Sequence, residues 1–166
     1  MPVDSYKWLP PSLKVYTANM QVPPYDGVPW TPLAKPLRDA RIALVTTAGI
    51  NMRGIEPPFD YAAEQERPNW GDPTFRTLPR DLKQKQVQTG HLHINNADLE
   101  QDVNIALPVH RMLELEAAGE IGALADNHHS FMGYQPDTTE WRERYAPEAA
   151  RRMKQESVDA VLLTPV

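Results

Sequence analysis

Two short histidine clusters supply the groups in this sequence that can move protons near neutral pH. His91 and His93 lie two residues apart, and His128 and His129 are followed directly by Ser130. The ordinary pKa of histidine is the closest to neutrality of any side chain, which suits it to general acid and base work. We therefore take His91, His93 and His128 as candidate proton-transfer groups. A structural hydrogen-bonding role remains the alternative for at least one of the first pair.

Metal, thiol and hydrolase chemistry find less support. The first histidine pair could bind a metal together with Asp98 or Asp102, but no third ligand lies at a diagnostic spacing, so we expect no metal. The chain contains no cysteine, which excludes a disulfide or a thiol nucleophile within these residues. Ser130 lies outside any Gly-x-Ser-x-Gly elbow, and no glycine-rich nucleotide motif is present.

The elements that must position these groups alternate between strands and helices. Continuous apolar runs bounded by turn residues predict strands at residues 41–50, 87–94, 121–125 and 159–166. Caps and helix-starting prolines predict helices at residues 97–104, 108–119 and 137–156. Residues 51–86 read as a long loop. The alternation favours an α/β fold with an open, mainly parallel sheet and helices on both faces, a Rossmann-like arrangement. Residues 42–46 and 161–164 are the expected central, buried strands.

The carboxyl ends of such strands form the expected binding rim. Open parallel sheets bind ligands beyond the carboxyl ends of their strands. Three strand ends would meet there: residues 46–49, residues 127–130 after the third strand, and residues 164–166. The candidate substrate-binding residues on this rim are Thr46, Thr47, Gly49, Ser130 and Thr164.

The first 40 residues differ from the rest of the chain. Prolines crowd this segment, and 17 prolines in 166 residues is about twice the usual share of about 5%. Aromatic residues are interleaved with them, at Tyr6, Trp8, Tyr25 and Trp30. We predict an extended arm over residues 1–40 and an α/β domain over residues 41–166.

Charge and hydropathy narrow the classes of partner. The formal charge of −5 disfavours a nucleic-acid partner, which needs a basic face. No apolar run reaches the roughly 18–20 residues of a membrane span, and no secretory signal opens the chain. We therefore expect a cytoplasmic protein with neither a nucleic-acid nor a membrane partner.

Four motifs together carry a resemblance to a known family. They are Gly71-Asp-Pro-Thr-Phe-Arg76, His91-Leu-His93, His128-His-Ser-Phe-Met-Gly-Tyr134 and Val158-Asp-Ala-Val-Leu-Leu-Thr-Pro-Val166. In this order, they resemble the selenoprotein B subunit of the glycine, sarcosine, betaine and D-proline reductases. The resemblance runs from about residue 41 to the end. In that family a selenocysteine or cysteine follows shortly after the last strand. The resemblance therefore implies that the C-terminal part of the domain is missing and that the nucleophile lies just after Val166.

The resemblance also implies a reaction. Such a subunit cleaves the carbon–nitrogen bond of glycine, sarcosine, betaine or D-proline reductively, with a pyruvoyl group on a partner subunit holding the amine. A selenolate or thiolate attacks the α-carbon, and a dithiol system supplies the electrons. The 166 residues alone would then be inactive, with no cofactor of their own. The alternative is a non-catalytic α/β domain that binds a partner protein or small molecule and ends at Val166.

Overall fold

The chain divides into two compact units, residues 1–32 and residues 33–166, and the computed structural model describes residues 5–19, 27, 31–67 and 69–166. The first unit contains a 3-10 turn at Ser5–Trp8 and helix α1 at Pro11–Asn19. The expectation of an extended arm was wrong for α1. Pro11 occupies the first helical position, where the missing N–H costs nothing, and the next proline is Pro23. Tyr25 and Trp30 lie outside the described residues.

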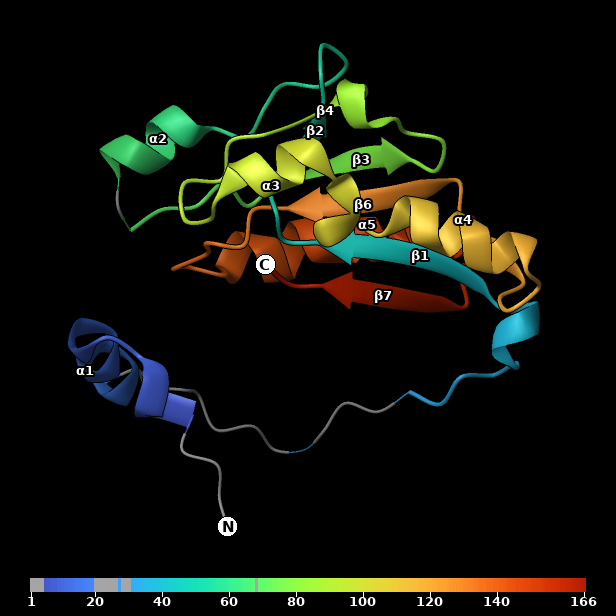
Figure 1. Cartoon of the computed structure of the whole chain (residues 1–166), viewed down its shortest axis with the longest axis horizontal. Coiled ribbons are helices and arrows are strands. Elements are labelled where there is room, and N and C mark those ends of the chain that lie inside the picture. The colour runs from blue at the N-terminus through green and yellow to red at the C-terminus, as the bar shows by residue number, and fades with distance from the viewer. Residues whose placement is uncertain (1–4, 20–26, 28–30, 68) are drawn as a thin grey trace. The chain divides into compact units, whose positions relative to one another are not determined.

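A mixed sheet forms the centre of the second unit (Figure 1). Strand β1 (Arg41–Thr46) is parallel to β5 (Ala123–Leu124), β6 (Asn127–Phe131) and β7 (Ala160–Thr164). The short β5 and then β6 pair with successive parts of one edge of β1, and β7 pairs along the other edge. Strand β3 (Phe75–Pro79) is antiparallel to β6. The predicted α/β class is therefore confirmed, and the sheet is mixed.

Burial differs between the two strands that were expected to be central. β1 is buried almost throughout, with Ala43 and Leu44 fully inaccessible. β7 is an edge strand of the described sheet, and Val161, Leu162 and Leu163 are 39%, 41% and 66% exposed. The prediction of a buried strand at 161–164 was therefore wrong for this chain, because only one edge of β7 is paired.

A second, two-stranded sheet stands apart from the first. β2 (Ile50–Met52) and β4 (Val87–Thr89) pair antiparallel. The strand predicted at residues 87–94 is thus shorter than expected and outside the main sheet. Residues 51–86, read as a loop, also contain helix α2 (Tyr61–Glu66) and β3. Long-range pairing, rather than a local apolar pattern, stabilises these short elements.

The remaining helices follow the predicted order. α3 (Asn96–Gln101) begins at a cap in which the Asn95 side chain accepts from Ala97 N, and α4 (Val109–Ala117) begins after Pro108. A π-helical turn at Trp141–Tyr145 leads into α5 (Ala146–Gln155). Figure 1 shows α3 and α4 in front of the sheet and α5 behind it. None of the helices in the described ranges has the length and apolar composition needed to cross a bilayer.

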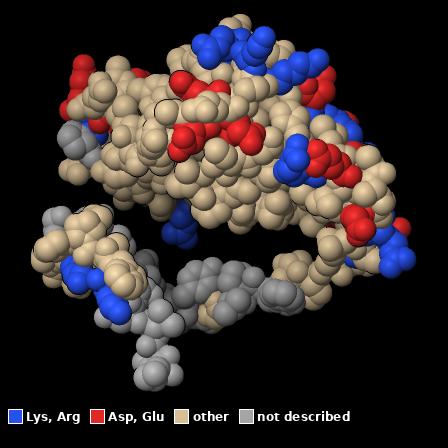
Figure 2. Space-filling model, viewed as in Figure 1, with Lys and Arg blue, Asp and Glu red and all other residues tan. Residues whose placement is uncertain are grey.

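Charged side chains of both signs form separate patches on the largely uncharged face seen in Figure 2. Acidic side chains gather where Figure 1 places α3, and basic side chains gather above the β2–β4 sheet. The histidine loop at residues 91–93 connects these two elements, since it lies between β4 and α3 in the chain.

Candidate active site

Three hydroxyl side chains lie in one row across the carboxyl end of the sheet. The strand register pairs Thr46 with Ser130 on β6 and with Thr164 on β7. Their hydroxyls mainly bind backbone: Thr46 Oγ1 donates to Thr164 O at 3.2 Å, and Ser130 Oγ accepts from Ile50 N at 2.8 Å. Thr164 Oγ1 donates to Ala106 O at 2.6 Å. This row therefore fixes the turns that leave the strands.

The turn after β1 holds the end of the chain. Thr47 Oγ1 accepts from Val166 N at 2.9 Å, so the backbone leaving β7 lies against the backbone leaving β1. Gly49 has φ +61° and donates its N–H to Phe131 O at 3.0 Å. A Cβ at Gly49 would lie 3.0 Å from Met132 Cε, the flexible end of that side chain, so the positive φ is the main reason for glycine here.

A small pocket opens beside this turn. Its volume is about 210 Å³, and its walls are Thr47, Phe131, Met132, Gly133, Gln135, Thr138 and Trp141. The rings of Phe131 and Trp141 meet edge to face with centroids 5.4 Å apart. The pocket lies beyond the carboxyl ends of β1 and β6, the position at which open α/β sheets bind ligands. Its lining contains no acidic or basic side chain.

His128 belongs to the interior of the sheet rather than to a rim loop. Its strand, β6, covers residues 127–130, which were expected to follow the end of the third strand at the rim. His128 Nδ1 accepts from Leu44 N at 3.2 Å, at the step of β1 between the β5 and β6 pairings. The ring thus replaces a missing ladder bond. Burial lowers the pKa of His128 to about 4, with a smaller contribution from neighbouring His129.

His129 points to the opposite face of the sheet, because neighbouring strand residues alternate. Its ring packs edge-on against Phe75 with centroids 5.1 Å apart, and burial together with the Arg152 charge lowers the pKa of His129 to about 4. Both ring nitrogens are buried and have no hydrogen-bond partner among the described residues. A neutral, packed ring is the form that this environment favours.

The other histidine pair lies outside the main sheet. His91 is buried, its Nδ1 accepts from His93 N at 3.1 Å, and burial lowers the pKa of its ring. The His93 side chain is 47% exposed, and its Nε2 lies 2.8 Å from Glu64 Oε1. The His93 ring stacks on Tyr134 with centroids 4.2 Å apart. This arrangement joins a buried carboxylate to an accessible imidazole.

Tyr61 connects the histidine loop to the rim. Its hydroxyl donates to Gly49 O at 3.1 Å and accepts from Gly90 N at 3.0 Å. Burial raises the pKa of Tyr61 above its ordinary value, so the phenol stays protonated and can donate. Helix α2, which carries Tyr61, therefore fixes the spacing between the turn after β1 and the loop that carries His91.

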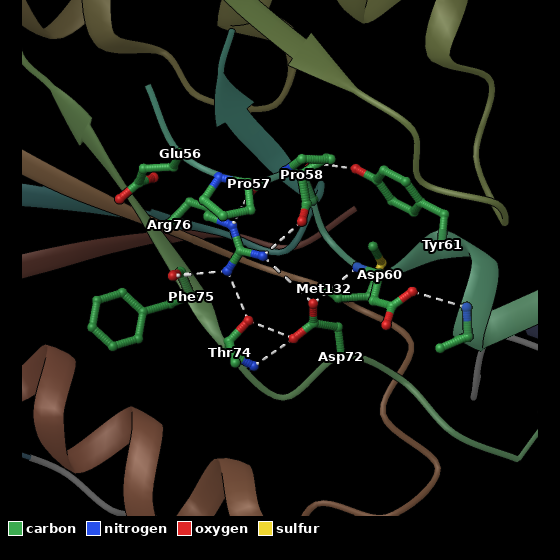
Figure 3. A network of polar contacts seen from close by, with 12 residues as sticks. Glu56, Pro57, Pro58, Asp60, Tyr61, Asp72, Thr74, Phe75, Arg76 and Met132 are labelled. Carbon is green, nitrogen blue, oxygen red and sulfur yellow. Dashed lines mark hydrogen bonds and ion pairs between the residues drawn. The ribbon is translucent and has the colours of Figure 1, made fainter. Parts of the chain in front are cut away.

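The Gly71–Arg76 motif forms a buried polar network (Figure 3). Arg76 donates to Pro57 O at 2.7 Å, Pro58 O at 3.0 Å, Thr74 Oγ1 at 2.7 Å and Phe75 O at 3.1 Å, and its Nη2 lies 3.5 Å from Asp72 Oδ2. Asp72 also accepts from the backbone N–H of Asp60 and Thr74. These partners occupy the donors of the guanidinium, so the motif holds the 56–60 loop against β3. A wider hollow of about 840 Å³ borders it.

Residues 12–166 match the glycine/sarcosine/betaine reductase selenoprotein B family. The chain belongs to this family. It is 36% identical over 152 residues to the D-proline reductase subunit gamma of Acetoanaerobium sticklandii, covering 92% of the chain and 59% of that relative. It is also 36% identical over 149 residues to the glycine reductase complex component B subunit gamma of Symbiobacterium thermophilum, covering 90% of the chain and 34% of that relative.

A third relative is named for a different substrate. The betaine reductase complex component B subunit beta of Peptoclostridium acidaminophilum is 29% identical over 150 residues, which is 90% of the chain and 33% of that relative. The chain thus spans between about a third and three fifths of the length of these relatives. No solved structure matches the chain significantly.

The structure brings some of the predicted site residues together and separates others. Thr46, Thr47, Gly49, Ser130 and Thr164 meet at the end of the sheet. His91 joins them, because its Cβ lies 3.7 Å from the position of a Cβ on Gly49. His128 lies inside the sheet instead. Sequence reasoning missed Glu64, Tyr61 and Trp141; the helix-capping Asp60, whose side chain accepts from Ala63 N, is the local signal for the first two.

Proposed function

We propose that this chain forms the N-terminal part of a reductase subunit that cleaves the carbon–nitrogen bond of glycine, sarcosine, betaine or D-proline. Membership of the reductase family supports the reaction class. The printed names of the relatives include D-proline, glycine and betaine reductases, so all three substrates stay within the proposal. The names also describe subunits or components of complexes, which supports the need for partner subunits.

One observation supports the proposed location of the active site. Val166 N donates to Thr47 Oγ1 at 2.9 Å, and Thr47 is a wall of the 210 Å³ pocket. A nucleophile placed shortly after Val166 would therefore emerge beside this pocket. The pocket is smaller than the roughly 300–1,000 Å³ of most ligand sites, which suits a small substrate, and it lies at the end of the sheet where ligands bind in this class of fold.

The described residues that line the pocket carry no charge that would repel an anionic nucleophile. A thiolate or selenolate would still need a positive group beside it, and we propose that the additional polypeptide or a partner subunit supplies that group. A selenocysteine or cysteine there, with a pyruvoyl carbonyl on a partner subunit and a dithiol donor, would supply the bond-breaking chemistry. Phe131 and Trp141 would exclude water from the reacting carbon. Thr47 would hold the backbone on which the nucleophile is carried.

The exposed, unpaired edge of β7 favours the proposal that further polypeptide packs against this strand. Val161, Leu162 and Leu163 are at least 39% exposed, and the outer edge of β7 is unpaired among the described strands. An apolar unpaired edge favours the addition of another strand. We infer that the extra length of the relatives packs on this edge and completes the pocket.

The first test is the reading of the codons that follow Val166 in the gene. An in-frame UGA or cysteine codon, with a further cysteine codon close behind, is expected. A UAA or UAG codon followed by unrelated sequence would instead favour a non-catalytic domain that binds a partner or small molecule through the β7 edge.

The second test is reconstitution. The full-length gene product and its partner subunits are incubated with a dithiol and each of the four substrates. The products to measure are ammonia from glycine, methylamine from sarcosine, trimethylamine from betaine and 5-aminopentanoate from D-proline. Release from at least one substrate is expected, and the chain that ends at Val166 serves as the inactive control. Absence of all four products from the complete complex would refute the proposal.

A further inference from the structure

Solvent exposure of the ring distinguishes the three candidate histidines. The rings of His91 and His128 are buried, whereas the His93 side chain is 47% exposed. His93 is also paired with a carboxylate, because its Nε2 lies 2.8 Å from Glu64 Oε1. A proton donor must reach its substrate. The geometry therefore favours His93.

We propose that Glu64 is a positioning residue for His93, and that His93 gives a proton to the substrate nitrogen as its bond to the α-carbon breaks. This inference rests on the proposed function, because that bond cleavage belongs to the proposed reaction. Glu64 acts through His93 and does not contact the substrate. Its carboxylate fixes the orientation of the imidazole through Nε2, as a carboxylate does behind a catalytic histidine in other enzymes.

The surroundings of Glu64 match this role. Its side chain is 2% exposed, and its Oε2 is buried without a hydrogen-bond partner among the described residues. A buried carboxylate is costly unless a partner offsets its charge. His93 is the histidine that meets this carboxylate, with its Nε2 2.8 Å from Glu64 Oε1.

Helix α2 holds Glu64 at a fixed place. The Asp60 side chain caps the helix by accepting from Ala63 N at 2.9 Å. Three residues before Glu64, the Tyr61 hydroxyl bonds both to Gly49 O and to Gly90 N. The carboxylate is therefore anchored to the turn after β1 and to the loop that leads to His93.

The ring of His93 is held on more than one side. The titratable groups that face it are Glu64 from α2, His91 from its own loop, at 5.8 Å between ring centroids, and Tyr134 after β6, at 4.2 Å. Since Nε2 binds Glu64, Nδ1 is the nitrogen left to meet a substrate.

A chain of packed residues links His93 to the pocket. Tyr134, which stacks on His93, directly follows Gly133 of the pocket wall. Gly133 packs so closely on Thr47 that a Cβ would lie 2.9 Å from Thr47 O. Thr47 in turn binds Val166. The proposed donor is therefore connected through Tyr134, Gly133 and Thr47 to the place where the nucleophile would emerge.

The proposed step balances as follows. The bond from the α-carbon to nitrogen breaks, and a bond from that carbon to the anionic nucleophile forms. The nitrogen keeps the bonding electron pair and takes the proton from Nδ1, so the imidazolium becomes neutral. The histidine then recovers a proton from water, and the dithiol donor of the proposed reaction supplies the two electrons of the reduction.

The test uses the full-length subunit in its complex. His93→Gln is expected to lower kcat about 100-fold or more while KM changes little, as loss of a general acid does. Glu64→Gln keeps the shape of the side chain and removes its charge, so we expect a smaller fall, of about 10-fold. Glu64→Asp should recover part of the loss. Added imidazole should raise the rate of His93→Ala, because the half-exposed position leaves room for it.

A matched control and a second readout separate chemistry from folding. Glu116→Gln removes a carboxylate that lies 2.6 Å from Arg80, away from His93, and should turn over as wild type does. In the 15N-histidine-labelled subunit, a downfield imidazole N–H resonance should disappear in His93→Gln and move upfield in Glu64→Gln. Wild-type kcat in both variants would overturn the proton-donor role. If the complex shows no reductase activity, the proposed function fails, and the resonance still tests whether Glu64 positions His93.

Discussion

β1 and β7 are neighbouring strands of similar sequence with opposite surroundings. The two strands pair residue for residue, from Ile42 with Ala160 to Thr46 with Thr164. Leu44 and Leu162 are register partners, yet Leu44 is fully buried and Leu162 is 41% exposed. Both strands read as continuous apolar runs. The difference therefore lies in the neighbours of each strand.

The comparison teaches what an apolar run can predict. Such a run indicates that a strand is buried in the finished assembly, because exposed apolar area is unfavourable by about 25 cal/mol per Å². It does not indicate which polypeptide provides the burial. β1 finds its neighbours within residues 33–166, whereas β7 finds a neighbour on one edge alone among the described strands.

The largest expected effect comes from truncating the two register partners. In the 166-residue chain, Leu44→Ala should lower the free energy of unfolding by about 3 kcal/mol, since it leaves a cavity in the core. Leu162→Ala should lower it by less than about 1 kcal/mol, because much of that side chain is already in water. Urea unfolding of both variants measures the difference.

The same two substitutions, made in the full-length subunit, test whether additional polypeptide covers β7. If additional polypeptide packs on β7, Leu162→Ala in the full-length subunit should cost nearly as much as Leu44→Ala. An equally small cost in both proteins would show that β7 is a natural outer edge. That result would weigh against the proposed completion of the pocket.

The second prediction is that acid lowers the free energy of unfolding by protonating His128, whose ring accepts a hydrogen bond from β1. The pKa of His128 is about 4 in the folded chain and about 6.5 in an unfolded one, so the unfolded state binds its proton first as pH falls. The contribution of neutral His128 to the free energy of unfolding is fully present above about pH 6.5. It is lost as the pH falls toward 4, by up to about 3 kcal/mol. Protonation also removes the acceptor for Leu44 N.

The variant His128→Gln isolates this effect. A glutamine oxygen can accept from Leu44 N but does not titrate, so unfolding of the variant should depend less on pH between 6.5 and 4. His110→Gln, at a partly buried histidine bonded to Asn104, is the matched control. Equal pH dependence of wild type and His128→Gln would contradict the buried-neutral assignment.

The third prediction concerns the turn that follows β1. Gly49→Ala should destabilise the chain by about 1–2 kcal/mol, because a left-handed φ of +61° strains any residue with a Cβ. The added carbon would also press on Met132, whose flexible end can move in part. Thermal unfolding measures the loss, with Gly119→Ala, where a Cβ would meet nothing within 4 Å, as the control for φ alone.

Local sequence patterns predicted the elements that interactions between nearby residues stabilise. β1 follows from its apolar run, α3 from the Asn95 cap and α4 from Pro108. The sequence did not predict β6, because His128, His129 and Ser130 are polar residues whose burial depends on neighbouring strands. The antiparallel place of β3 likewise depends on pairing with residues about 50 positions later.

The residues of the candidate site also divide into those that local sequence patterns predict and those that they do not. The rim hydroxyls were predictable, because strand ends of a parallel sheet share one edge. The Glu64–His93 pair was not, since 29 residues separate its members and neither carries a local signal of the other. The Arg76 network similarly joins β3 to the 56–60 loop through backbone carbonyls, which any sequence supplies.

The smallest expected effect on stability belongs to the outer edge of β7. Leu163 is 66% exposed, so Leu163→Lys should change the free energy of unfolding of the 166-residue chain by less than about 0.5 kcal/mol. Its effect on association should be larger, because a charge on an unpaired apolar edge opposes strand addition. Light scattering of the wild-type chain should show self-association that Leu163→Lys reduces. Lys substitution at Leu115 of α4, which is 42% exposed, controls for added charge and should leave association unchanged. A monodisperse wild-type monomer would mean that β7 needs no partner, and the contrast with β1 would then reflect a finished edge rather than an incomplete one.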